Sequence, residues 1–119
     1  MTLIIGSVNA TTPEQLRHYY QSGQYISEIE KKVIDCKQYL DSRLNRSKNE
    51  KLAIVLSIDE TALSNYESLM LNQFSADPQV FAVSYLFGNP QPIGPILELS
   101  RYAQSKQVAL FFISSRPLL

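Results

Sequence analysis

The stretch "LAIVLSIDETALSNY", residues 52–66, decides the fold class of this 119-residue chain. Its first five residues, Leu-Ala-Ile-Val-Leu, are continuously apolar, and a polar phrase follows them directly. A short apolar run after a polar loop is typical of a strand buried on both faces, as in a parallel sheet. We therefore expect a strand over 52–56, followed directly by the polar phrase Ser-Ile-Asp-Glu-Thr at 57–61.

A second apolar run, "QVALFFI" at 107–113, predicts another strand buried on both faces, and "SSRP" follows it. Between the two runs, apolar side chains from Ile96 to Ala103 predict a helix that ends near Lys106. Two buried strands joined by a crossover helix form a right-handed parallel unit. Ligands bind beyond the carboxyl ends of such strands, so the two polar phrases mark a candidate site.

The N-terminal third predicts helices. Thr12 can cap a helix, Pro13 suits its first position, and Gln15 can close a capping box. Gly23 predicts a break, and an apolar stripe with helical spacing follows it. The stripe consists of Ile26, Ile29, Val33, Cys36, Leu40 and Leu44. Cys36 is best explained as a small core residue. The sequence thus predicts an α/β fold in which helices precede a parallel sheet.

The middle of the chain is less regular. Residues 64–75 predict a weak helix, "SADP" at 75–78 predicts a turn, and "GNPQPIGP" at 88–95 predicts a loop. Residues 79–87 fit more than one structure.

The composition excludes several classes of function. Eleven basic residues balance eleven acidic ones, so no charge excess points to nucleic acid or an anionic membrane. No apolar run approaches the roughly 18 residues that span a bilayer. The single cysteine excludes an intrachain disulfide. We expect neither a nucleic-acid partner nor a membrane span.

Residues 1–10, "MTLIIGSVNA", have two interpretations. Leu3 to Ile5 resemble the end of a signal-peptide apolar stretch, and Val8 and Ala10 occupy the −3 and −1 places of a cleavage site. The charged region that opens a signal peptide is missing, so a frayed N-terminus is the alternative. The first interpretation predicts a periplasmic or secreted protein.

Two phrases resemble a known family. "IVLSIDETALSNY" resembles the first motif of the haloacid dehalogenase (HAD) superfamily, normally Asp-x-Asp-x-Thr. Its "LSNY" end resembles the subfamily IIIB acid phosphatases, the group of the class B and C enzymes and the plant vegetative storage proteins. "PIGPILELSRYAQSKQVALFFISSRP" resembles the segment with the second motif. The resemblance covers residues 12–117 and implies a partial HAD-like Rossmannoid fold over 11–119.

The resemblance implies a role for each matching residue. Ser57 stands where the family has the Asp that attacks phosphorus and ligates Mg²⁺. Asp59 matches the general acid and base, whose backbone carbonyl also ligates Mg²⁺. Thr61 matches the residue that holds the loop, and Ser114 the hydroxyl that binds a phosphate oxygen. Arg116 is a further expected charge near the anion. The implied substrate is a small phosphomonoester.

Ser57 puts catalysis in doubt. A carboxylate nucleophile is ionised without help, whereas a serine hydroxyl needs an activating base. Losing the nucleophile typically costs about 10⁴ to 10⁶ in rate. The family's third-motif Lys and fourth-motif acidic pair are also absent from these 119 residues. We expect an inactive or nearly inactive chain with little capacity for Mg²⁺.

Two questions stay open on this sequence, one about the extent of the chain and one about its function. The chain is a fragment of a longer phosphatase or folds as a homo-oligomer, because an open sheet edge invites pairing. The alternative to both is a short natural chain that folds compactly. In function, a phosphatase that has lost activity competes with a non-catalytic storage or binding member of the same family, and with a parallel α/β domain without phosphate chemistry.

Overall fold

The computed structural model describes residues 12–46, 49–74, 77, 79 and 88–116. The elements, in chain order, are α1 (Pro13–Gln21), α2 (Gln24–Arg46), β1 (Ala53–Ser57), β2 (Leu63–Ser64), α3 (Tyr66–Leu71), β3 (Gln91–Pro92), α5 (Gly94–Ser105) and β4 (Ala109–Ile113). Segment 1–10 and most of segment 75–87 lie outside the described residues, so the predictions made for them stay predictions.

The two N-terminal helices begin and break where the sequence predicts. The Thr12 hydroxyl accepts from the Gln15 amide at 3.2 Å, and the Gln15 side chain accepts from the Thr12 amide at 3.0 Å. This reciprocal pair is a complete capping box. Gly23 has φ +86, a conformation that disfavours L side chains, and it separates α1 from α2.

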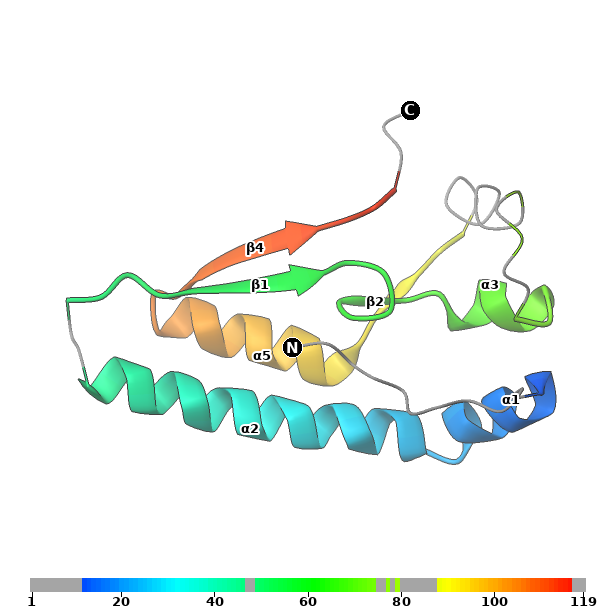
Figure 1. The fold of residues 1–119 in the computed structure, drawn as a ribbon, viewed down its shortest axis with the longest axis horizontal. Coiled ribbons are helices and arrows are strands. Elements are labelled where there is room, and N and C mark those ends of the chain that lie inside the picture. The colour runs from blue at the N-terminus through cyan, green and yellow to red at the C-terminus, as the bar shows by residue number, and fades with distance from the viewer. Residues whose placement is uncertain (1–11, 47–48, 75–76, 78, 80–87, 117–119) are drawn as a thin grey trace.

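The predicted parallel sheet is confirmed. β1 and β4 pair in parallel from Ala53 opposite Ala109 to Ser57 opposite Ile113, and α5 precedes β4 on the return path. Both strands therefore end at the same edge (Figure 1). Segment 88–95 is more ordered than expected, because Gln91–Pro92 form β3 and pair antiparallel with β2.

The core lies between the sheet and the two long helices. One cluster contains Val33 with Ile93, Ile96 and Leu99, and the other contains Leu40 with Ala103 and Val108. Ile54 packs against both clusters. The predicted stripe of α2 thus faces the core, with Ile29, Cys36 and Leu44 partly buried against it. Ile26 is the exception, at 37% exposed.

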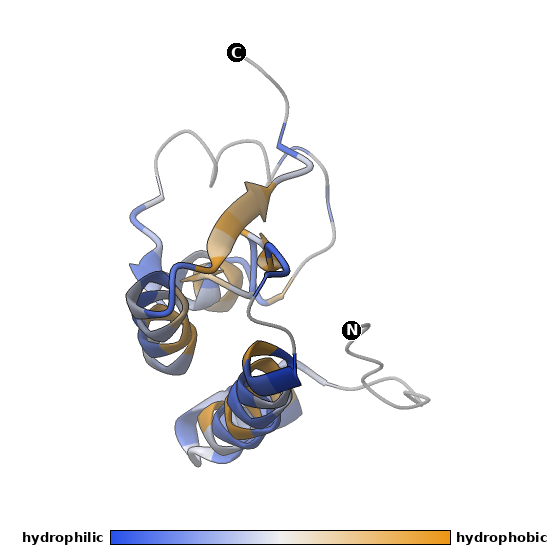
Figure 2. Cartoon of the chain, turned by 90° about the vertical axis from the view of Figure 1, so that its left-hand side faces the viewer, coloured by the Kyte–Doolittle hydropathy of each residue, from blue (hydrophilic) through white to orange (hydrophobic). Residues whose placement is uncertain are grey.

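The prediction that both strands are buried on both faces is wrong. Exposed and partly buried residues alternate along β1, so only one of its faces is covered. Val55 is 60% exposed, and Phe111 and Ile113 on β4 are each 57% exposed. The reason is that α2 and α5 both pack on the same side of the sheet (Figure 1). We call the uncovered side chains of Val55, Phe111 and Ile113 the open face; Figure 2 colours these strands as hydrophobic.

The weak helix predicted over 64–75 is shorter than expected. α3 spans Tyr66–Leu71, and positive φ angles at Gln73 (53) and Phe74 (57) end the helical path. Among the described residues, no helix has the length and apolarity needed to cross a membrane.

Candidate functional site

Two polar loops lie side by side where β1 and β4 end. The Ile58 amide donates to the Ile113 carbonyl at 2.9 Å, so the two segments stay paired one residue beyond the end of β1. The first loop continues with Asp59 and Thr61, and the second with Ser114 and Arg116. The structure thus brings the two predicted phrases together.

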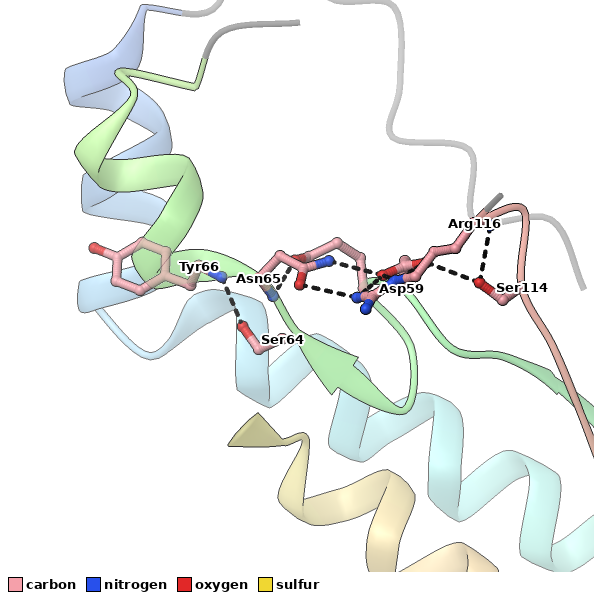
Figure 3. Close-up of polar contacts among 7 residues, drawn as sticks. Asp59, Ser64, Asn65, Tyr66, Ser114 and Arg116 are labelled. Carbon is pink, nitrogen blue, oxygen red and sulfur yellow. Dashed lines mark hydrogen bonds and ion pairs between the residues drawn. The ribbon is translucent and has the colours of Figure 1, made fainter. Parts of the chain in front are cut away.

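Asp59 is the centre of the larger group of polar contacts (Figure 3). Nε of Arg116 donates to Oδ1 of Asp59 at 2.9 Å, and a terminal nitrogen of the same guanidinium lies at 2.5 Å. The Asn65 side-chain nitrogen Nδ2 donates to Oδ1 at 3.0 Å, and the Ser114 hydroxyl donates to Oδ2 at 3.4 Å. Asp59 and Arg116 are both largely covered, at 22% and 26% exposed.

These contacts keep Asp59 ionised. The hydrogen bond from Arg116 is the largest cause that lowers the pKa of Asp59 below its ordinary value of 3.8, and the bond from Asn65 adds to it. Partial burial opposes this shift without cancelling it. At neutral pH the carboxylate is therefore ionised, and both of its oxygens already accept hydrogen bonds.

Ser57 belongs to a separate, smaller group. Its hydroxyl lies 2.6 Å from the Thr61 hydroxyl, and either can donate. Within the described part of the chain, no hydrogen bond joins Ser57 to Asp59. The five predicted residues therefore lie on adjoining loops but form two groups, Ser57 with Thr61, and Asp59 with Ser114 and Arg116.

The shape of the first loop comes from its own backbone. The Ile58 carbonyl accepts from the amides of Ala62 at 3.1 Å and Leu63 at 2.9 Å. The Glu60 amide donates to the Leu63 carbonyl at 2.9 Å, and Glu60 itself has φ +57. The tight reversal returns the chain to β2, and Asn65 then comes back within reach of Asp59.

Sequence reasoning missed two residues of this site. Asn65 bonds Asp59, and the Glu60 carboxylate accepts from the Asn65 backbone amide at 2.6 Å. The motif pattern marks strand ends, and Asn65 lies six residues beyond Asp59, so no strand-end signal points to it. Its only sequence signal is its place in the "LSNY" phrase.

The described residues do not fit the Mg²⁺ site that the resemblance implies. No group of three or more His, Cys, Asp or Glu among them could hold a metal ion. Mg²⁺ prefers carboxylate oxygens, but Ser57 offers only a hydroxyl and the Asp59 carboxylate is bonded to Arg116. The Asp59 backbone carbonyl alone cannot make a site.

A small cavity of about 170 Å³ adjoins the site on the side of Asn65. It lies below the range of about 300 to 1,000 Å³ usual for small-molecule sites. Its lining comes from the start of α3 and from the segment around β3, residues Ser64, Asn65, Tyr66, Glu67, Ser68, Asn89, Pro90 and Gln91.

Comparison with known proteins agrees with the motifs. The family model described as HAD superfamily, subfamily IIIB (Acid phosphatase), matches residues 5–118. No curated protein and no solved structure gave a significant match. The match covers nearly the whole chain and both polar loops.

Proposed function

Because the chain belongs to the acid phosphatases of subfamily IIIB of the HAD superfamily, we propose that it recognises the phosphoryl group of small phosphomonoesters without transferring it. Ser57 at the end of β1 carries this proposal. It occupies the place that the family motif gives to an attacking carboxylate, and a neutral hydroxyl stands there instead.

Among the described residues, no base accepts a hydrogen bond from the Ser57 hydroxyl. Its hydrogen-bond partner is the Thr61 hydroxyl, which is not a base at neutral pH. Asp59 is the nearest carboxylate in the sequence, but its donors are Arg116, Asn65 and Ser114. A serine without a base is a poor nucleophile. We therefore expect turnover to be lower by about 10⁴ to 10⁶ than with an intact nucleophile.

The same loops carry donors that can bind an anion. The hydroxyls of Ser57, Thr61 and Ser114 and the guanidinium of Arg116 are donors suited to phosphate oxygens. Asp59 competes with the ligand, because its negative charge repels a phosphate and holds Arg116. Binding therefore requires the Asp59–Arg116 pair to rearrange, and we expect a weak affinity.

A hydrolysis assay tests the loss of transfer. The purified chain is incubated with p-nitrophenyl phosphate, with and without Mg²⁺, beside its Asp59→Asn variant. We expect both proteins to release nitrophenol at the buffer rate. Hydrolysis by the original chain that disappears in Asp59→Asn would overturn the proposal. A rise in Ser57→Asp would assign the loss to residue 57.

Phosphorus NMR of inorganic phosphate tests recognition. We expect the phosphate signal to broaden with the original chain and to broaden less with Arg116→Gln. Asp59→Asn should bind phosphate on the order of tenfold more tightly, because a like charge is removed and Arg116 is released. No broadening with any of the three proteins would reject phosphate recognition.

A storage or other binding role is the second candidate, and Ser57 also favours it. Loss of the nucleophile is compatible with any role that needs no turnover. The two candidates differ in the NMR experiment, because a storage protein has no need to bind phosphate.

The signal-like segment 1–10 further leads us to propose a periplasmic or secreted location, which fractionation of the source cells would test.

A further inference from the structure

The Glu60 carboxylate accepts hydrogen bonds from its own loop and from both N-terminal helices. Its Oε1 accepts from the Asn65 backbone amide at 2.6 Å. Its Oε2 accepts from the Tyr20 hydroxyl at 3.0 Å and the Tyr25 hydroxyl at 3.2 Å. The two tyrosines precede Glu60 by 40 and 35 residues. One side chain thus joins the loop of Asp59 to both N-terminal helices.

The turn at Gly23 sets the two tyrosines against each other. Tyr20 is in α1 and Tyr25 in α2, and their ring centroids lie 4.3 Å apart. The Tyr66 ring of α3 packs on Tyr20 at 4.5 Å, and Tyr19 packs edge-on against both rings of the pair. Rings packed from several sides lose rotational freedom, so their hydroxyls point to a fixed place.

Both hydroxyls stay protonated over the whole neutral range. Burial raises the pKa of Tyr20 and of Tyr25 above the ordinary value of 10.0, and the charge of Glu60 raises it further. Each hydroxyl can therefore donate to the carboxylate. Hydrogen bonds to a charged acceptor are stronger than neutral ones.

Glu60 also holds a backbone conformation that few side chains adopt. Its φ of +57 is in the left-handed region, where a non-glycine residue persists only if its surroundings hold it there. Its side chain accepts from Asn65, and the Asn65 side chain in turn donates to Asp59. The hydrogen bonds from Tyr20 and Tyr25 to this carboxylate therefore affect the position of Asp59 in two ways. One is through the peptide bond that joins Asp59 to Glu60, and the other is through Asn65.

We propose that Glu60 is a positioning residue, and that its bonds to Tyr20 and Tyr25 let the α1–α2 turn set the placement of Asp59 and Asn65. The part played by phosphate rests on the proposed function. The link itself does not, because it concerns the geometry of the loop without ligand. The other interpretation is that the bonds only fasten the helices to the domain.

Removing the two hydroxyls tests the link. The Tyr20→Phe/Tyr25→Phe variant keeps both rings and deletes only the donors. Tyr19→Phe is the matched control, because its ring is in the same cluster but its hydroxyl bonds Glu28. The deciding readout is the titration midpoint of the Asp59 carboxyl carbon by NMR. If the bonds only fastened the helices to the domain, this midpoint would not change.

We expect the Asp59 midpoint to move up toward 3.8 in the double variant and in Glu60→Gln, and to stay in place in Tyr19→Phe. The backbone amide hydrogen of Asn65 should exchange with solvent roughly five- to tenfold faster in the double variant and in Glu60→Gln. An unchanged Asp59 midpoint in the folded double variant, which keeps the negative charge of Glu60, would overturn the inference. If the double variant fails to fold, the single variants and Glu60→Gln decide.

Phosphate binding separates the two proposals. If the original chain binds phosphate, the Tyr20→Phe/Tyr25→Phe variant should bind it several-fold more weakly, whereas Tyr19→Phe should match the original; equal affinity in the double variant would exclude any role of the link in binding. If the original chain binds no phosphate, the proposed function fails. The Asp59 midpoint still decides the positioning role of Glu60 in that case.

Discussion

Asp59 shows how a single side chain depends on neighbours from both loops. Its charge is held by Arg116 from one loop and by Asn65 from the other side of its own loop. A carboxylate with these donors stays ionised well into the acid range. The same donors occupy it, so its capacity to exchange protons with a ligand depends on opening the Arg116 pair.

The lowered pKa of Asp59 predicts an acid-dependent loss of stability. The bonds from Arg116 and Asn65 favour the charged form in the folded protein, so their stabilising effect is present above the ordinary value of 3.8. It is lost as the pH falls through the lower, folded-state pKa. Asp59→Asn should therefore lower the free energy of unfolding by about 1 kcal/mol at neutral pH.

Chemical denaturation at a series of pH values measures this effect. The difference between the original chain and Asp59→Asn should shrink below pH 3.8 and vanish at the acid end. Arg116→Gln should show a similar loss at neutral pH. A difference that persists unchanged in acid would mean that Asp59 stabilises the fold by its shape and not by its charge.

At the scale of elements, local signals account for most of the boundaries. The capping box at Thr12 and the break at Gly23 involve contacts between residues close in sequence, so a pattern of residue types is sufficient to predict them. The crossover helix is an exception, because it begins at Gly94, inside the segment 88–95 that the sequence predicts as a loop. The short pairing of β2 with β3 escaped prediction because it depends on two segments about 30 residues apart.

Gly23→Ala tests the turn between α1 and α2. A Cβ at this position meets nothing within 4 Å, so the expected loss comes from the backbone alone. A side chain at φ +86 should lower the free energy of unfolding by about 1 to 2 kcal/mol. Gly94→Ala is the matched control, because it also has open space but no positive φ.

Urea unfolding of the two variants supplies the comparison. Gly94→Ala should be neutral or stabilising by up to about 1 kcal/mol, since alanine restricts the unfolded chain. Equal stabilities for Gly23→Ala and Gly94→Ala would show that the turn does not need its left-handed residue. Because Tyr20 and Tyr25 flank the turn, Gly23→Ala should also weaken their bonds to Glu60.

At the scale of the whole molecule, the sheet has one covered side. Ile54 and Leu110 are partly buried against the core that α2 and α5 form, whereas the open face of Val55, Phe111 and Ile113 stays in contact with water. Contiguous exposed apolar side chains favour association. Within the described ranges, β1 and β4 pair only with each other, so each is an edge strand, and edge strands can pair with another chain.

We therefore predict concentration-dependent self-association through the open face. Phe111→Ser should shift the sedimentation profile toward the monomer, because it removes the largest exposed side chain of that face. Leu71→Ser is the control, since Leu71 is 80% exposed but lies on α3. A profile that responds equally to both substitutions would exclude a specific role for the open face.

The sequence alone determined the helices, the two parallel strands and the meeting of Asp59, Ser114 and Arg116 at their ends. The physical reason is that helix caps and apolar periodicity are local, and a right-handed crossover places both strand ends at one edge. The motifs likewise identified the family that the matching family model then supported.

Only the tertiary structure decided three other features. The open face exists because both long helices pack on one side, which the apolar runs of the strands do not encode. Ser57 contacts Thr61 because backbone bonds from Ala62 and Leu63 turn the loop back toward the end of β1. Glu60 meets Tyr20 and Tyr25 across 40 and 35 residues. Contacts over such separations depend on how whole elements pack, and no local pattern of residues specifies them.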